Sequence, residues 1–103
     1  MKGDALMNLF DICMEIAMVE NGLAEGSIQF DYPKLAMAMG AGHPADILDD
    51  IFCEVGEAVY LGKDVTKEQL ENLLSGIKSF SNDFKIKELK LPISHLKEYI
   101  ESL

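Results

Sequence analysis

The sequence contains no arginine, and its 9 lysines are outnumbered by 18 aspartates and glutamates, so the formal net charge is −9. Nucleic acids and anionic membranes are bound through lysine and arginine side chains, which displace counterions from phosphate groups. This shortage of positive charge argues against either one as a direct partner. It favours a basic protein partner, although an acidic surface that serves only solubility explains the same composition.

Cysteine is also scarce, and long uncharged stretches are absent. The two cysteines, Cys13 and Cys53, both lie among apolar residues, and we expect them to be small buried hydrophobic side chains in a reducing compartment. No stretch of about 20 residues is free of charge, so we expect no membrane span. The early charges Asp4, Asp11 and Glu15 argue against a signal peptide. These features predict a cytoplasmic protein.

Residue types that perform catalysis are few. A nucleophilic cysteine needs a histidine and an orienting third group, but the histidines are His43, beside Pro44, and His95, in the last predicted helix. We expect His43 to start a helix and His95 to lie on the surface. Asp49 and Asp50 are adjacent, so on a helix they diverge by about 100°, which is poor geometry for a general acid and base. We therefore predict that the protein is not an enzyme.

One set of residues has ligand types that suit a metal ion. Its members are His43, Asp46, Asp50 and Cys53. Asp46 and Asp50 share a face of the predicted helix, but the sequence contains neither an EF-hand loop nor a Cys-x-x-Cys pair. The glycine-rich segment 40–42 lacks the preceding strand and the later spacing of a phosphate-binding loop. We expect no metal and no cofactor.

Length and periodicity predict a single all-α domain over residues 1–103, folded as a compact bundle of four to five helices. A first helix is expected over 4–20, ending at Asn21-Gly22. Because it is apolar around most of its circumference, we expect it to pack on two or more sides. Residues 34–39, after Pro33, also favour a helix.

The second half of the chain has clearer boundary signals. Thr66 and Gln69 form a capping box that starts a helix, and residues 81–83 are expected to end it. Pro92 opens a last helix. Two stretches of the chain stay ambiguous: 27–32 is either a short strand or the start of a helix, and 84–91 is either a short edge strand or an extended arm.

The most unusual stretch is the predicted helix from Pro44 to Gly62. One face is apolar, and no lysine lies between His43 and Lys63. Residues 1–62 contain 11 acidic residues and two lysines, whereas residues 63–103 contain seven of each, so the negative excess lies in the first three-fifths of the chain. The other face consists of carboxylates, which we expect to contact a basic partner: Asp46, Asp49, Asp50, Glu54 and Glu57.

Two segments resemble a known protein family. They are A-D-I-L-D-D-I-F-C-E-V at 45–55 and D-V-T-K-E-Q-L-E-N-L-L at 64–74. An acidic helix followed by a D-x-x-x-E-x-L helix is similar to the small bacterial immunity proteins of the colicin D type, over about residues 45–80. The resemblance implies a helical bundle that binds the basic nuclease domain of a toxin and blocks its substrate site with the five carboxylates just named. The glycine-rich segment 40–42 and the lysine-rich segment 85–90 depart from the family pattern.

Two other functions fit the same features. One is a helical adaptor or regulatory homodimer, in which the first helix and the methionines at 18, 37 and 39 form the subunit interface. The other is a phage-type inhibitor whose carboxylates imitate the phosphates of DNA. Both the monomer and the homodimer are consistent with the sequence.

Overall fold

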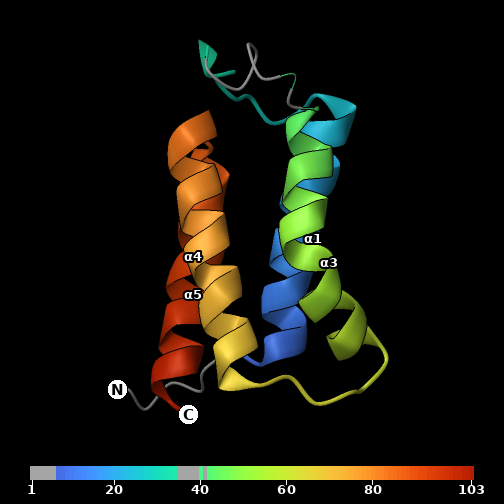
Figure 1. The fold of residues 1–103 in the computed structure, drawn as a ribbon, viewed down its shortest axis with the longest axis vertical. Coiled ribbons are helices and arrows are strands. Elements are labelled where there is room, and N and C mark those ends of the chain that lie inside the picture. The colour runs from blue at the N-terminus through green and yellow to red at the C-terminus, as the bar shows by residue number, and fades with distance from the viewer. Residues whose placement is uncertain (1–6, 35–39, 41) are drawn as a thin grey trace.

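The computed structural model describes residues 7–34, 40 and 42–103, where the chain forms four α-helices and one short 3-10 helix (Figure 1). They are α1 (Leu9–Glu25), α3 (Pro44–Tyr60), α4 (Lys67–Phe84), η1 (Lys87–Leu89) and α5 (Lys90–Glu101). The described residues contain no strand. The predicted all-α bundle is therefore confirmed. Apart from Lys34, which is helical, the helix expected over 34–39 lies outside the described residues.

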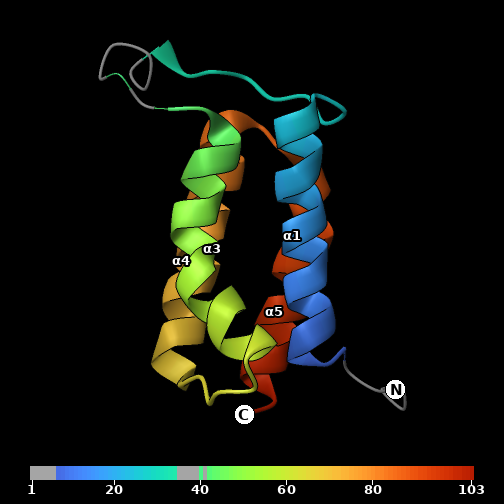
Figure 2. The same ribbon diagram turned by 90° about the vertical axis from the view of Figure 1, so that its right-hand side faces the viewer.

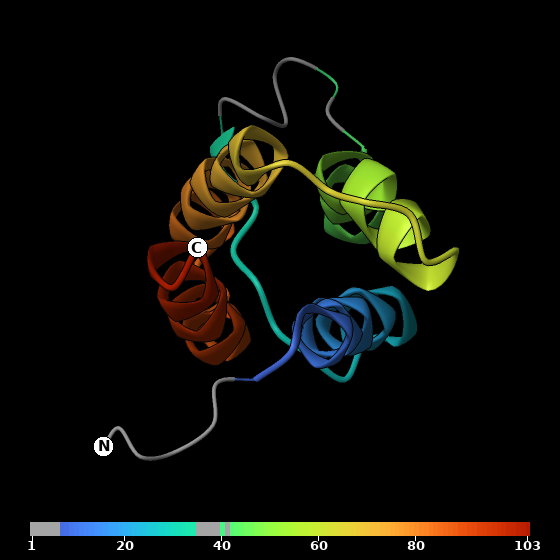
Figure 3. The ribbon, with the colours of Figure 1, turned by 90° about the horizontal axis from the view of Figure 1, so that it is seen from below.

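The four helices run alternately up and down and form a ring. α1 and α4 point in one direction, and α3 and α5 point in the other (Figure 1, Figure 2). Seen from one end of the bundle, α1 lies beside α3 and α5, and α4 lies beside the same two helices (Figure 3). Each helix thus packs against two neighbours, as in other antiparallel four-helix bundles.

The space inside the ring is filled by aliphatic and aromatic side chains. The largest fully buried ones come from every helix and from the turn before α5: Ile12, Ile16, Leu23, Leu48, Leu70, Ile77, Ile86, Leu89 and Leu96. Cys13 is buried among them as predicted, but Cys53 is exposed. The prediction for Cys53 was wrong because this residue lies on the outer side of α3. None of the described helices has the combination of length and hydrophobicity that a membrane span requires.

α1 starts and ends later than its sequence signals predict. The side chain of Asn8 caps it by accepting a hydrogen bond from the Asp11 N–H at 2.8 Å, and Gly26, with φ 90°, ends it. The helix runs straight through Asn21-Gly22. Gly22 packs closely against the segment that folds back after the helix: a Cβ there would lie 2.5 Å from the Cδ1 of Ile28, so the Ile28 side chain would have to shift.

α3 matches its predicted bounds closely. Nδ1 of His43 accepts a hydrogen bond from the Ala45 N–H at 3.0 Å, Pro44 is the first helical residue, and Gly62, with φ 74°, follows the end. The role expected for His43 is therefore confirmed. The last turns of α3 bend away from the axis of its first part (Figure 1).

The region from 81 to 91 corrects two predictions. The capping box at Thr66 and Gln69 is present, but α4 continues through 81–83 to Phe84 and ends at Lys85, which has φ 57°. Residues 84–91 form neither a strand nor an arm. They turn through η1 directly into α5, which begins two residues before Pro92. The apolar residues that looked like strand alternation, Phe84, Ile86 and Leu89, are all buried at this corner.

The segment between α1 and α3 was also ambiguous, and residues 27–32 contain neither a helix nor a strand. They cross one end of the bundle from the end of α1 toward α4 (Figure 2). The Asp31 N–H donates a 2.8 Å hydrogen bond to the Phe84 carbonyl, and the Tyr32 and Phe84 rings lie 5.8 Å apart. These contacts hold the segment against the end of α4, and α1 and α3 pack directly against each other.

A candidate protein-binding surface on α1 and α3

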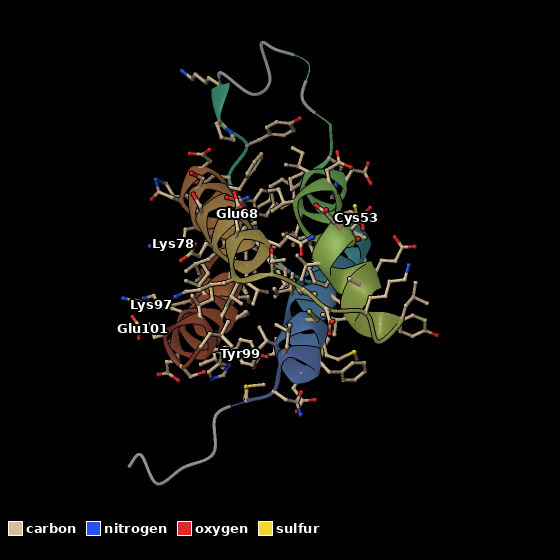
Figure 4. The ribbon with its side chains drawn as sticks, turned by 60° about the horizontal axis from the view of Figure 1, so that its bottom comes forward. Cys53, Glu68, Lys78, Lys97, Tyr99 and Glu101 are labelled. Atoms are coloured by element: carbon tan, nitrogen blue, oxygen red, sulfur yellow. The ribbon has the colours of Figure 1, made fainter. Side chains whose placement is uncertain are left out.

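Charge is segregated between two halves of the bundle. α1 carries four acidic residues and α3 carries five, and neither helix contains a lysine. α4, η1 and α5 together carry six acidic residues and five lysines, which nearly balance. Figure 4 shows Cys53 of α3 on one side of the molecule and Lys78 of α4 and Lys97 of α5 on the opposite side. The negative charge is therefore a property of the α1–α3 pair.

All five carboxylates named from the sequence, Asp46, Asp49, Asp50, Glu54 and Glu57, are exposed on α3. Among the described residues, the structure gives none of them a lysine or histidine partner within ion-pair distance. Glu54 accepts a 3.3 Å hydrogen bond from the Gln69 side chain at the start of α4. α3 thus presents a row of carboxylates that are not neutralised within the described part of the chain.

Glu20 of α1 belongs to the same surface, although it is not among the carboxylates predicted from the sequence. Burial, followed by the charge of Asp49, a hydrogen bond with Asp49 and the charge of Asp46, raises the pKa of Glu20 to about 7. Asp11 and Glu15 lie on one narrow polar stripe, and the spacing shows only that Glu20, five residues after Glu15, falls outside that stripe. The structure shows that Glu20 faces Asp49 and Asp46 of α3.

A groove runs between the first half of α1 and the second half of α3, with a volume of about 350 Å³. Asp49 and Glu57 are among its lining residues, and so is Gly56, where a Cβ would lie 2.7 Å from the Phe52 ring. The apolar lining residues are Phe10, Met14, Ala17, Phe52, Val59 and Tyr60. Among these, Phe10 is 50% exposed, Met14 is 47% exposed and Tyr60 is 79% exposed. Large apolar side chains are therefore open to solvent beside the acidic row.

The histidines and cysteines do not assemble a reactive centre with these groups. Nδ1 of His43 is occupied by the helix cap, and His95, expected on the surface, is partly buried and hydrogen-bonded to Glu15 on α1. Cys13 is buried, and burial raises the pKa of its thiol to about 11. Within the described ranges, no three histidine, cysteine, aspartate or glutamate side chains are placed to share a metal ion.

No family model, curated protein or solved structure matches this chain. The class of the protein therefore rests on its fold and surface. It is a small antiparallel four-helix bundle with one acidic and partly apolar side.

Proposed function

We propose that this protein binds a basic protein partner through the carboxylates on the outer side of α3, with the neighbouring part of α1 extending the contact surface. One observation supports the proposal above all others. The α1–α3 pair carries nine carboxylates and no lysine, while the opposite half of the bundle nearly balances its charges. A field of one sign on one side attracts a basic partner and orients it during approach.

The structural support for the carboxylates makes them suitable for binding. α3 has a side-chain cap at its start, and it packs against both α1 and α4. The acidic row is therefore held in place before a partner arrives, which reduces the entropy lost when the complex forms. Among the described residues, no lysine or histidine is paired with the carboxylates of α3, so no internal ion pair has to break before they bind a partner.

In its more specific form, the proposal is that the protein is an immunity protein acting in the cytoplasm of a bacterium. Its partner is then the cationic nuclease domain of a toxin, which binds nucleic acid through lysine and arginine side chains. Carboxylates that pair with those side chains occupy the place of substrate phosphates. The similarity of residues 45–80 to immunity proteins of the colicin D type supports this form.

The test compares two triple charge reversals that change the net charge equally. The first is Asp50→Lys, Glu54→Lys and Glu57→Lys on α3, and the second is Glu68→Lys, Glu71→Lys and Asp83→Lys on α4. All six residues are exposed. The probe is a catalytically inactive nuclease domain of a colicin D-type toxin, and the measurement is its dissociation constant at two salt concentrations.

We expect the α3 reversal to abolish binding and the α4 reversal to weaken it only slightly, with unchanged helical circular dichroism in both. Equal losses in the two variants would show that net charge alone matters and that α3 is not the contact surface. Retained binding in the α3 variant would exclude α3 as the contact surface, and an absence of binding by the parent protein would count against the immunity form.

A further inference from the structure

α1 has a second apolar face that no other described segment covers. Phe10, Met14 and Met18 follow one another at intervals of four residues, so they lie on one side of the helix. Phe10 and Met14 are about half exposed, and Met18 is 68% exposed. The buried face of α1 lies on the other side, where Ile12 and Ile16 enter the core. Among the described helices, α1 packs against α3, α5 and η1, and these contacts leave Phe10, Met14 and Met18 exposed.

This open face continues into the groove on α3. Phe10 and Met14 form one wall, and Val59 and Tyr60 form the other. Methionine side chains adapt to varied apolar partners because they are flexible and polarizable. The groove is thus an apolar channel with carboxylates at its edges.

We infer that this groove seats the apolar face of an amphipathic helix whose flanking residues are lysine or arginine. The inference rests on the proposed function above, because it assigns a secondary structure and a side-chain pattern to the basic partner. Apolar side chains at helical spacing fill the channel between α1 and α3. The basic residues beside them then meet Asp49, Glu57 and the rest of the acidic row.

The groove favours a helix because of what lines it. All of its lining residues belong to α1 and α3, so their backbone groups are engaged within helices, and the described chain offers no strand edge for an extended peptide to pair with. A helix docks by side chains alone. Two adjacent helices form a natural seat for a third, whose side chains pack between theirs.

The charge on the groove edges argues against a second copy of this chain as the occupant. A two-fold symmetric dimer brings the same patch of both subunits together. It would place the lysine-free α1–α3 pair of one subunit, with nine carboxylates, against the same pair of its partner. Like charges at such an interface oppose association.

The test uses two synthetic peptides of about 18 residues made of leucine and lysine. In one peptide the leucines lie on a single helical face, and in the other the same residues are distributed evenly around the helix. Binding is measured by fluorescence anisotropy. A second readout is the modification rate of Cys53 by a thiol reagent. Cys53 lines the groove and is exposed, whereas Cys13 is buried and its raised pKa keeps it unreactive.

Two matched variants separate the groove from general charge effects. Met14→Glu adds a carboxylate inside the groove, and Leu91→Glu adds one on α5 at a residue that is 59% exposed and does not line the groove. Attraction by charge alone predicts slightly tighter binding of a lysine peptide to both variants. Tyr60→Ser provides a second groove variant at a highly exposed position, should Met14→Glu alter the circular dichroism.

We expect the amphipathic peptide to bind at least about tenfold more tightly than its rearranged counterpart, and to slow the modification of Cys53. Met14→Glu should weaken that binding by about tenfold, while Leu91→Glu changes it less than about twofold. Equal binding of the two peptides, or no effect of Met14→Glu, overturns the groove assignment and leaves the acidic partner surface standing.

The remaining outcomes also decide the question. If neither peptide binds, the groove assignment fails, and the nuclease-domain experiment alone judges the acidic row. Sedimentation that shows a dimer, converted to a monomer by Met14→Glu, would identify a second copy as the occupant and overturn the inference.

Discussion

Nδ1 of His95 on α5 lies 2.9 Å from Oε1 of Glu15 on α1, and each side chain is 23% exposed. The two residues are 80 positions apart in the sequence. Their contact joins the first and last helices of the described chain and so closes the ring of four helices. Because a carboxylate only accepts hydrogen bonds, the imidazole is the donor when Glu15 is ionised.

Removing this contact should destabilise the bundle modestly. We expect His95→Ala to lower the free energy of unfolding by about 1 kcal/mol, because a partly buried carboxylate loses its hydrogen-bond donor. Urea unfolding followed by circular dichroism measures the change. Lys97→Ala, at an exposed position of the same helix, serves as the control and should shift stability by less than about 0.5 kcal/mol. Equal effects of the two substitutions would mean that the contact contributes nothing.

Helices α3 and α4 approach each other closely at Gly76. The effect of Gly76→Ala on stability should therefore change sign when the neighbouring Ile51 side chain is removed. A Cβ at Gly76 of α4 would lie 2.8 Å from Cγ2 of Ile51 of α3, which is branched next to the backbone and cannot swing aside easily. Gly76→Ala should therefore destabilise the protein by about 1 kcal/mol, despite the better helix propensity of alanine.

In the Ile51→Ala background the same substitution should stabilise the protein, by up to about 1 kcal/mol, because only the propensity gain remains. The two double-mutant comparisons require four urea unfolding curves. Stabilisation by Gly76→Ala in both backgrounds would show that the two helices are not in close contact there.

Glu20 should make stability fall as pH rises. Its folded pKa of about 7 lies above the ordinary value of 4.5, so the folded protein holds the proton more tightly than the unfolded chain between these two values. Stability from this residue is therefore present at about pH 4 and is lost as the pH approaches about 7.

The measurement is the urea midpoint of the parent protein and of Glu20→Gln between about pH 4 and 8. We expect the variant to be more stable than the parent at the upper end, because the amide removes a charge facing Asp49 and Asp46, and to match it at the lower end. Glu25→Gln, at an exposed position of the same helix, is the control. Its stability difference from the parent should not change with pH in this way. A parallel pH profile for Glu20→Gln would contradict the assigned cause.

The parts of the fold that the sequence predicted depend on local signals. Pro44 and Gly62 delimit α3, and Thr66 with Gln69 starts α4, because caps and turns involve residues within a few positions of each other. The alternation of apolar and charged residues at 84–91 gave a wrong prediction, because local signals do not determine the structure of this segment. Such a short run fits either a strand or a tight corner, and burial at the end of the ring selected the corner.

The candidate surface was predicted only in part. The five carboxylates of α3 follow from one helical face, and they are exposed as that face requires. Glu20 and the groove depend on which side of α1 meets α3, and no spacing within either helix determines that pairing. Gly22 illustrates the same limit, since its glycine serves contact with Ile28 and not the end of the helix.

The absence of lysine from α1 and α3 has a practical consequence for handling the molecule. Reagents that couple to amines attach fluorophores, resins or sensor surfaces through lysine side chains. Five lysines belong to α4, η1 and α5, on the other half of the ring, and the described chain also has exposed lysines at 34 and 63. Coupling at the five lysines of α4, η1 and α5 immobilises the protein by that half and leaves the acidic row and the groove facing the solution, so Lys63, which follows α3, is the lysine to replace first.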